Sequence, residues 1–133
     1  EGHKLKAYLP GGASGGILPS TLSNIPLDFD TLQEHGCFIG SAAVIIISDK
    51  VPMKDVAINL MKFFEEESCG QCTPCRNGTT MAVKLMNENN WDLKLLTDVG
   101  NVMTDASICG LGQAAANPLF SVIKHFADDL KSI

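Results

Sequence analysis

Residues 69–75 read Cys69-Gly70-Gln71-Cys72-Thr73-Pro74-Cys75, and this stretch decides how the rest of the sequence is interpreted. Three thiols separated by two residues each can surround one small inorganic centre. A fourth ligand has to come from elsewhere in the fold, and Cys109 follows after 33 residues, 76–108. The pattern predicts one [4Fe–4S] cluster, because four thiolates commonly hold a cubane cluster. Its ligands would be Cys69, Cys72, Cys75 and Cys109.

Other uses of the cysteines are less compatible with this spacing. A structural zinc site usually takes two separated cysteine pairs, whereas here three cysteines lie together and the fourth is distant. A zinc-binding interaction domain is the alternative function. Cys72 and Cys75 form a C-x-x-C motif, but a redox motif of that kind normally follows a strand, whereas a helix is expected here. The chain has five cysteines, and the grouping of three of them within seven residues also fits ligation in a reducing compartment better than disulfides. Cys37 is interpreted as a small buried residue outside the site.

Composition narrows the class of protein. The chain has 133 residues, of which 45% are apolar and 19% charged, with a formal net charge of −5. That length allows one domain or two very small ones. Its basic residues are scattered, so nucleic acid is not expected as a partner. The longest apolar run, 38–47, is too short to insert in a membrane. The chain begins with neither an initiator Met nor a signal peptide, which suggests a piece of a longer protein.

The first half of the sequence is predicted to be rich in β structure. Residues 4–9 form a weakly alternating strand candidate, and the glycine-rich segment 10–16 is interpreted as a structural turn, since it matches no phosphate-binding motif. Residues 28–35 suit a short helix or turn that stops at Gly36. Residues 42–48 contain a β-branched run, Val44 to Ile47, that favours a buried strand.

The second half is predicted to form about four helices. Apolar residues at 53, 56, 57, 60, 61 and 64 lie on one face of a helix. Thr73-Pro74 and Asn117-Pro118 each resemble an N-cap followed by proline, which favours helices from 74 to 86 and after 118. Another helix is expected over 92–104, and residues 119, 122, 123, 126 and 130 extend a last apolar stripe. The predicted class is α+β, with domains at 1–50 and 51–133.

Four segments carry a resemblance to a known family. Residues 67–78 closely resemble the cluster-binding motif of the flavin-bearing, NADH-oxidising subunit of respiratory complex I, a family that includes diaphorase subunits of NAD-dependent formate dehydrogenases and NAD-linked hydrogenases. Residues 107–112 are similar to the family's fourth-ligand segment. Residues 10–16 and 40–49 resemble the small domain that precedes the cluster-binding motif in that family. The resemblance implies a partial β-grasp domain (ubiquitin-like, of the SLBB type) followed by a four-helix-bundle-like [4Fe–4S] domain.

The resemblance also implies a function. The cluster would relay single electrons between FMN, which exchanges hydride with NAD(H), and Fe–S centres of partner subunits in a multisubunit oxidoreductase. FMN and NAD(H) would bind only a domain N-terminal to this segment, so the chain alone is not expected to be catalytic. The implied location is cytoplasmic, including the cytoplasmic side of a membrane complex, or the mitochondrial matrix. Residues 109–118 look more like the diaphorases than complex I, and Asn77 departs from a commonly acidic position.

Overall fold

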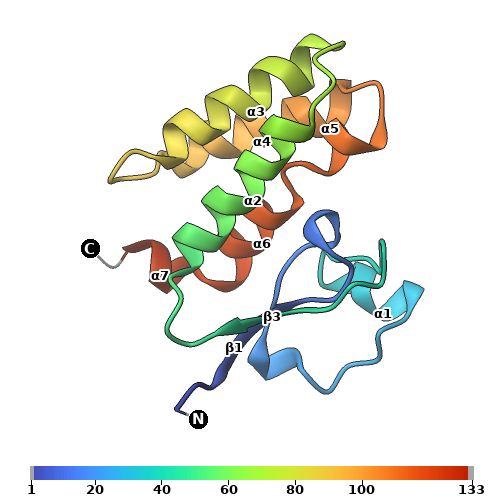
Figure 1. The fold of residues 1–133 in the computed structure, drawn as a ribbon, viewed down its shortest axis with the longest axis vertical. Coiled ribbons are helices and arrows are strands. Elements are labelled where there is room, and N and C mark those ends of the chain that lie inside the picture. The colour runs from blue at the N-terminus through green and yellow to red at the C-terminus, as the bar shows by residue number, and fades with distance from the viewer. Residues whose placement is uncertain (1, 132–133) are drawn as a thin grey trace.

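A computed structural model describes residues 2–131 and contains a small sheet beside a larger group of helices (Figure 1). The sheet has three antiparallel strands in the order β2-β1-β3. Its strands are β1 (Leu5–Leu9), β2 (Leu18–Pro19) and β3 (Ile45–Ser48), with the short helix α1 (Phe29–Glu34) between β2 and β3. The α+β class and the strand expected over 4–9 are therefore confirmed.

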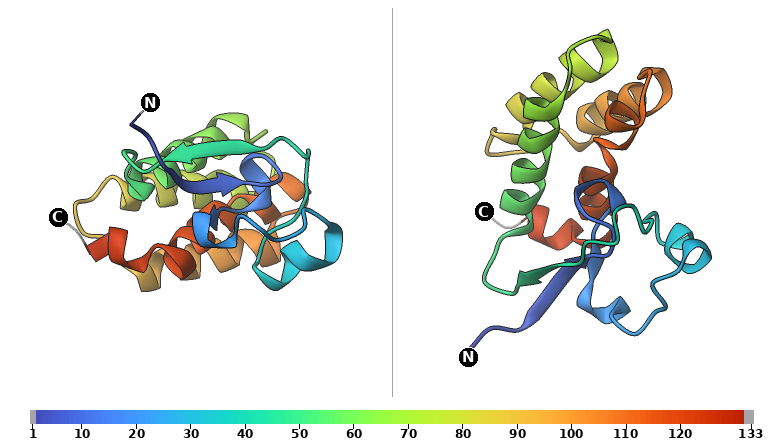
Figure 2. Two further views of the ribbon diagram at one scale, coloured as in Figure 1. Left: turned by 90° about the horizontal axis from the view of Figure 1, so that it is seen from below. Right: turned by 45° about the vertical axis from the view of Figure 1, so that its right-hand side comes forward.

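Six helices follow the sheet along the chain, in the order α2 to α7. They span Met53–Glu67 (α2), Thr73–Met86 (α3), Leu93–Ala106 (α4), Gly110–Ala114 (α5), Asn117–His125 (α6) and Ala127–Lys131 (α7). Figure 2 shows that α2, α3 and α4 extend away from the sheet, whereas α6 lies beside it. No helix within residues 2–131 is long and apolar enough to cross a membrane.

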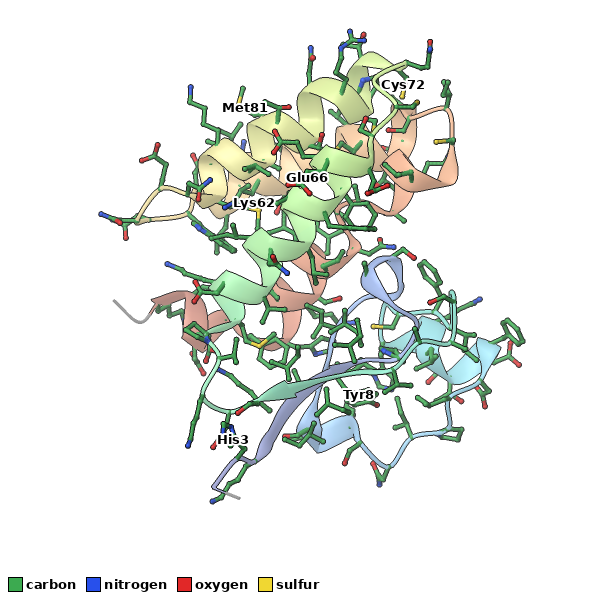
Figure 3. All side chains as sticks on the ribbon, in the orientation of Figure 1. His3, Tyr8, Lys62, Glu66, Cys72 and Met81 are labelled. Carbon is green, nitrogen blue, oxygen red and sulfur yellow. The ribbon has the colours of Figure 1, made fainter. Side chains whose placement is uncertain are left out.

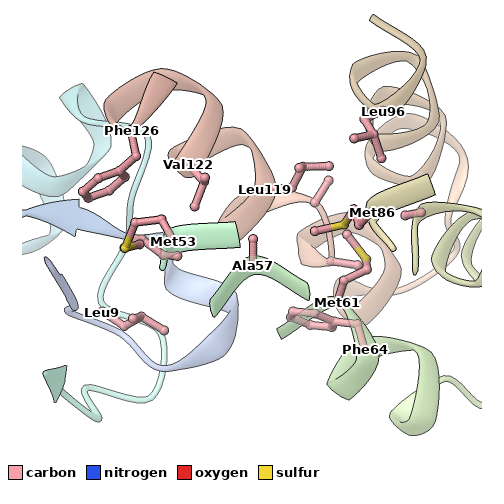
Figure 4. Packing of buried hydrophobic residues seen from close by; sticks show 14 of the residues in the cluster. Leu9, Met53, Ala57, Met61, Phe64, Met86, Leu96, Leu119, Val122 and Phe126 are labelled. Carbon is pink, nitrogen blue, oxygen red and sulfur yellow. The ribbon is translucent and has the colours of Figure 1, made fainter. Parts of the chain in front are cut away.

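The apolar periodicity of α2 correctly predicts its buried face. Met53, Ala57, Met61 and Phe64 are all buried, and they contact one cluster that includes Leu119 and Val122 of α6 (Figure 4). Burying such side chains contributes most of the stability of a helix in water, because helices of this length are marginal alone. Ala82 and Met86 of α3, and Leu96 and Met103 of α4, are also buried.

Helix starts differ from the expected caps by one residue. Asp28 and Asp92 act as N-caps whose carboxylates accept from backbone N–H groups. Thr73 is instead the first residue of α3, with Cys72 in the cap position and no side-chain cap bond. Asn117 likewise lies inside α6, and its amide donates to the carbonyl of Ser14 at 2.9 Å. The two prolines still occupy the first turns, as predicted.

The prediction of a buried strand over 42–48 is wrong in its burial. The strand exists as β3, but it forms one edge of the sheet. The side chains of Val44, Ile45 and Ile46 are all exposed, Ile46 to 64%. β-branched composition indicates an extended backbone, whereas burial depends on which elements cover it. Here α2 covers only part of β3, where Ile45 and Ile47 line a groove with Val56 and Leu60.

The last predicted helix is interrupted. The backbone leaves helical geometry at Phe126, where φ is −129° and ψ is 34°, and this divides the apolar stripe between α6 and α7. Phe126 stays buried in the break. Beyond it, Asp129 pairs with Lys6 of β1 at 2.5 Å, so the chain turns back toward the sheet. The short α5 was not predicted, because five residues carry too little periodicity.

The two halves of the chain share one core. Ala7, Leu9 and Ile17 belong to the same buried cluster as the residues of α2 and α6, while Tyr8 faces a smaller cluster with Leu18 and Leu32. The glycine-rich segment acts as a structural turn, as predicted: a Cβ on Gly11 would overlap the carbonyl oxygens of Phe38 and Ile39. The sheet therefore packs firmly on the base of the helices.

Candidate metal centre

One cavity of about 220 Å³ collects the cysteines of the predicted site. It lies where α2 ends, α3 begins and the loop before α5 passes, at the end of the helices remote from the sheet, where Figure 3 labels Cys72. Its lining includes Cys69, Cys72, Cys75 and Cys109. The fold thus carries Cys109 back across 33 intervening residues to the three clustered thiols.

The four thiols differ in exposure. Cys75 is buried at 5% exposure, Cys72 is half-buried, and Cys69 and Cys109 are exposed. A centre bound by all four would therefore be packed against the protein on the Cys75 side and reach the surface near Cys69 and Cys109.

Helix α3 fixes two of the thiols. Cys72 occupies its cap position and Cys75 lies in its first turn, where free N–H groups and the helix dipole favour negative charge. The backbone N–H of Arg76 donates to the carbonyl of Cys72 at 3.0 Å. The Arg76 guanidinium donates to the carbonyl of Gly70 at 2.6 Å, which holds the cysteine loop against the helix.

The end of α4 delivers the fourth thiol. The N–H of Ser107 donates to the carbonyl of Met103, which closes the helix two residues before Cys109. The side-chain amide of Gln113 donates to the carbonyl of Ser107 at 3.0 Å, and the N–H of Gln113 donates to the carbonyl of Cys109. These bonds hold the loop rigidly between α4 and α5.

Hydrogen bonds favour the charged form of Cys72. The backbone N–H of Ile108, followed by that of Cys75, lowers the pKa of the Cys72 thiol. A lowered pKa increases the thiolate fraction, and the thiolate is the form that binds metal. The loop that brings Cys109 to the cavity therefore also favours the thiolate form of Cys72.

Two serines at the site were missed from the sequence. The hydroxyl of Ser68 lies 3.2 Å from the Cys75 sulfur and accepts from the N–H of Gly70. Ser107 is buried, and its hydroxyl has no hydrogen-bond partner among residues 2–131. The only available signal was their position one and two residues before Cys69 and Cys109.

Residues expected to lie outside the site do so. Cys37 is buried at 2% exposure in the small cluster beside the sheet, and burial raises its pKa to about 11. His125 is near His35, and burial lowers its pKa. In the described part of the chain, no group of three or more His, Cys, Asp or Glu residues is placed to hold a single metal ion.

Comparisons with known proteins show which family this region resembles. Residues 55–133 match the family described as the NADH-ubiquinone oxidoreductase-F iron-sulfur binding region. The chain is 38% identical to the F subunit of NADH-quinone oxidoreductase from Rickettsia typhi, over 96% of this chain and 32% of that protein. It is 36% identical to mitochondrial NADH dehydrogenase [ubiquinone] flavoprotein 1 of Dictyostelium discoideum, over 96% of this chain and 28% of that protein.

A solved structure shares the fold. A chain of an NAD+-reducing [NiFe]-hydrogenase in the H2-reduced state superimposes with a TM-score of 0.84 at 30% identity. The match covers 96% of this chain and 23% of the hydrogenase chain. The present chain thus spans about a third or less of the length of the proteins it matches.

Proposed function

Because the chain belongs to the family of the NADH-ubiquinone oxidoreductase-F iron-sulfur binding region, we propose that it carries single electrons through one [4Fe–4S] cluster. The cluster supplies one-electron chemistry when bound. Its ligands in this proposal are Cys69, Cys72, Cys75 and Cys109. The observation that carries the proposal is their convergence on one cavity from two segments separated by 33 residues.

The arrangement of the cysteines along the chain supports a cluster over a zinc-binding interaction domain. Structural zinc sites usually take two separated cysteine pairs. Here three thiols lie two residues apart, the fourth follows after 33 residues, and all four line one cavity. The match to an iron-sulfur binding region supports the same choice.

Within a longer protein, the cluster would relay electrons between FMN, which exchanges hydride with NAD(H) in another domain, and Fe–S centres of partner subunits. The names of the relatives support an NAD(H)-linked oxidoreductase, as an NADH-quinone oxidoreductase and an NAD+-reducing hydrogenase share this segment. The hydrogenase match is compatible with a diaphorase of that type, whereas a formate dehydrogenase stays a prediction. The cytoplasmic or mitochondrial-matrix location also stays a prediction.

We also assign the fold more finely. Residues 1–50 form part of a β-grasp domain of the SLBB type, and residues 51–133 form the cluster-binding helical domain. The open edge and exposed apolar residues of β3 support a sheet that is completed by further strands. The shared core joins the two units, so we expect them to unfold together.

Metal analysis tests the ligand assignment. After anaerobic reconstitution we expect about four Fe and four sulfide per chain, the stoichiometry of one cubane. Cys109→Ser should strip or degrade the cluster, and Cys37→Ser is the matched control that should keep it. A colourless protein that binds zinc alone, or a cluster that depends on Cys37 and not on Cys109, would refute the assignment.

A further inference from the structure

Ser107 carries a buried hydroxyl whose hydrogen-bonding capacity is unused. The side chain is 6% exposed, and Oγ has no hydrogen-bond partner among the residues that the structure describes. Buried polar groups are nearly always paired, so an unpaired one next to a candidate cofactor site indicates a missing acceptor. The acceptor would have to lie inside the protein, because solvent does not reach this side chain.

The hydroxyl is held in place by its surroundings. Both backbone polar groups of Ser107 are engaged, the N–H with Met103 and the carbonyl with Gln113. Gly112 packs against its side chain, since a Cβ on that glycine would lie 2.6 Å from the Ser107 Cβ. The same added atom would lie 2.8 Å from the Cβ of Cys75. Ser107 is therefore wedged beside the thiols that line the cavity.

The thiols of the cavity are the acceptors within reach. A Cβ on Gly112 would lie 2.4 Å from the Ser107 hydroxyl oxygen and 2.8 Å from the Cβ of Cys75, so this hydroxyl lies beside a cysteine that lines the cavity. A neutral thiol is a weak acceptor, whereas an ionised ligand sulfur accepts strongly.

We propose that Ser107 is a positioning residue that donates its hydroxyl hydrogen to a cysteine sulfur of the site in the cluster-bound protein and raises the reduction potential of the cluster. This inference rests on the proposed function. Reduction adds one electron to the cluster and increases the negative charge on its sulfurs. The proton stays on Ser107, no covalent bond forms or breaks, and the hydrogen bond favours the reduced form.

A redox titration followed by EPR tests the proposal, with dithionite as reductant and ferricyanide as oxidant. The chain is reconstituted anaerobically as wild type, S107A and S107T. At a fixed potential, S107A should show a roughly three- to tenfold lower ratio of reduced to oxidised cluster, and tenfold corresponds to about 59 mV for one electron. S107T keeps the hydroxyl and should move the potential back toward wild type.

S121A is the matched control. Ser121 is also a buried serine, at 4% exposure, but its hydroxyl bonds with Ile17 and Asn117 beside the sheet. Its removal should leave the potential unchanged. A general effect of losing a buried hydroxyl would lower the potential in both variants and would overturn the proposal.

Pulsed EPR in D2O gives a second readout that does not depend on folding of the variant. The reduced wild-type cluster should couple to a hydroxyl deuteron beyond those of nearby amides, and S107A should lack that coupling. Absence of the coupling in wild type, or an unchanged potential in S107A with four Fe retained, overturns this proposal alone. Wild-type protein that takes up no Fe and sulfide refutes the proposed function, and the Ser107 inference with it.

Discussion

Gly112 faces Cys75 so closely that a Cβ on the glycine would lie 2.8 Å from the Cβ of the cysteine. Real Cβ atoms do not approach to this distance, so a larger residue at 112 has to displace α5 or the first turn of α3. Cys75 is the most buried of the four thiols at the cavity. The distance between α5 and the first turn of α3 thus depends on the absence of a side chain at residue 112.

We therefore expect Gly112→Ala to lower both stability and cluster content. Overpacking of this kind typically costs about 1–3 kcal/mol, more than the gain of about 1 kcal/mol in helix propensity. Urea unfolding of the apo chain and Fe per chain after reconstitution measure the two effects. Gly110→Ala is the matched control, because nothing lies within 4 Å of a Cβ at that glycine. Equal behaviour of the two variants would contradict the close packing.

Burial of Cys37 predicts a pH dependence of stability. Burial raises the pKa of this thiol to about 11 in the folded chain, above about 8.5 in an unfolded one. Between these values the unfolded state loses a proton that the folded state keeps, so stability falls as pH rises through this window. Below about pH 8.5 the contribution is fully present.

Urea unfolding at about pH 8 and about pH 10.5, on either side of the ordinary thiol pKa, measures this effect in the wild-type chain and in Cys37→Ala. The loss of stability on raising the pH should be smaller in the variant, which has no thiol to ionise. The other titrating groups are common to both proteins and cancel in the comparison. A loss of the same size in both would show that Cys37 does not ionise differently in the two states.

The two sides of the sheet predict unequal costs for the same substitution. Leu9 is 1% exposed in the shared core, whereas Ile46 on β3 is 64% exposed. Leu9→Ala should cost about 2–5 kcal/mol, as buried leucines do. Ile46→Ala removes a side chain of the same size and should stay within about 1 kcal/mol, since its loss leaves no cavity. Chemical denaturation measures both values. A large cost at Ile46 would indicate that this side chain is buried, as expected from the sequence.

Local signals in the sequence predicted the local structure well. The spacing of Met53, Ala57 and Met61 placed the buried face of α2, and the prolines marked the first turns of α3 and α6. Such features depend on neighbours three or four residues away. The chemistry of the cysteines also predicted that Cys109 would join the others, because a four-thiolate centre needs it.

Features that depend on distant contacts were not predictable in this way. The exposure of Ile46 follows from the edge position of β3, and the break at Phe126 accompanies the return of α7 toward β1. The buried hydroxyl of Ser107 lies against Gly112 of α5, where an added Cβ would be 2.4 Å from the hydroxyl oxygen. The spacing of apolar residues along the sequence does not indicate these contacts.

Attachment of α6 to the sheet predicts where removal of the metal will loosen the protein. The N–H of Ile17 donates to the hydroxyl of Ser121 at 3.0 Å, and the Asn117 amide donates to the Ser14 carbonyl at 2.9 Å. These bonds and the shared core do not involve the four cysteines of the cavity. At the other end of the molecule, α5 and the first turn of α3 meet at the cavity.

Hydrogen exchange on apo and reconstituted protein measures the difference. Because binding of a metal centre acts as folding energy for the segments that hold it, amides of Gly110–Ala114 and of the first turn of α3 should exchange faster in the apo chain. Amides of α6 should keep their protection, since the sheet holds them. Cys109→Ser should reproduce the apo pattern even after reconstitution, whereas Cys37→Ser should not. Equal loss of protection in α6 and α5 would mean that the cluster organises all the helices and that the sheet does not anchor them independently.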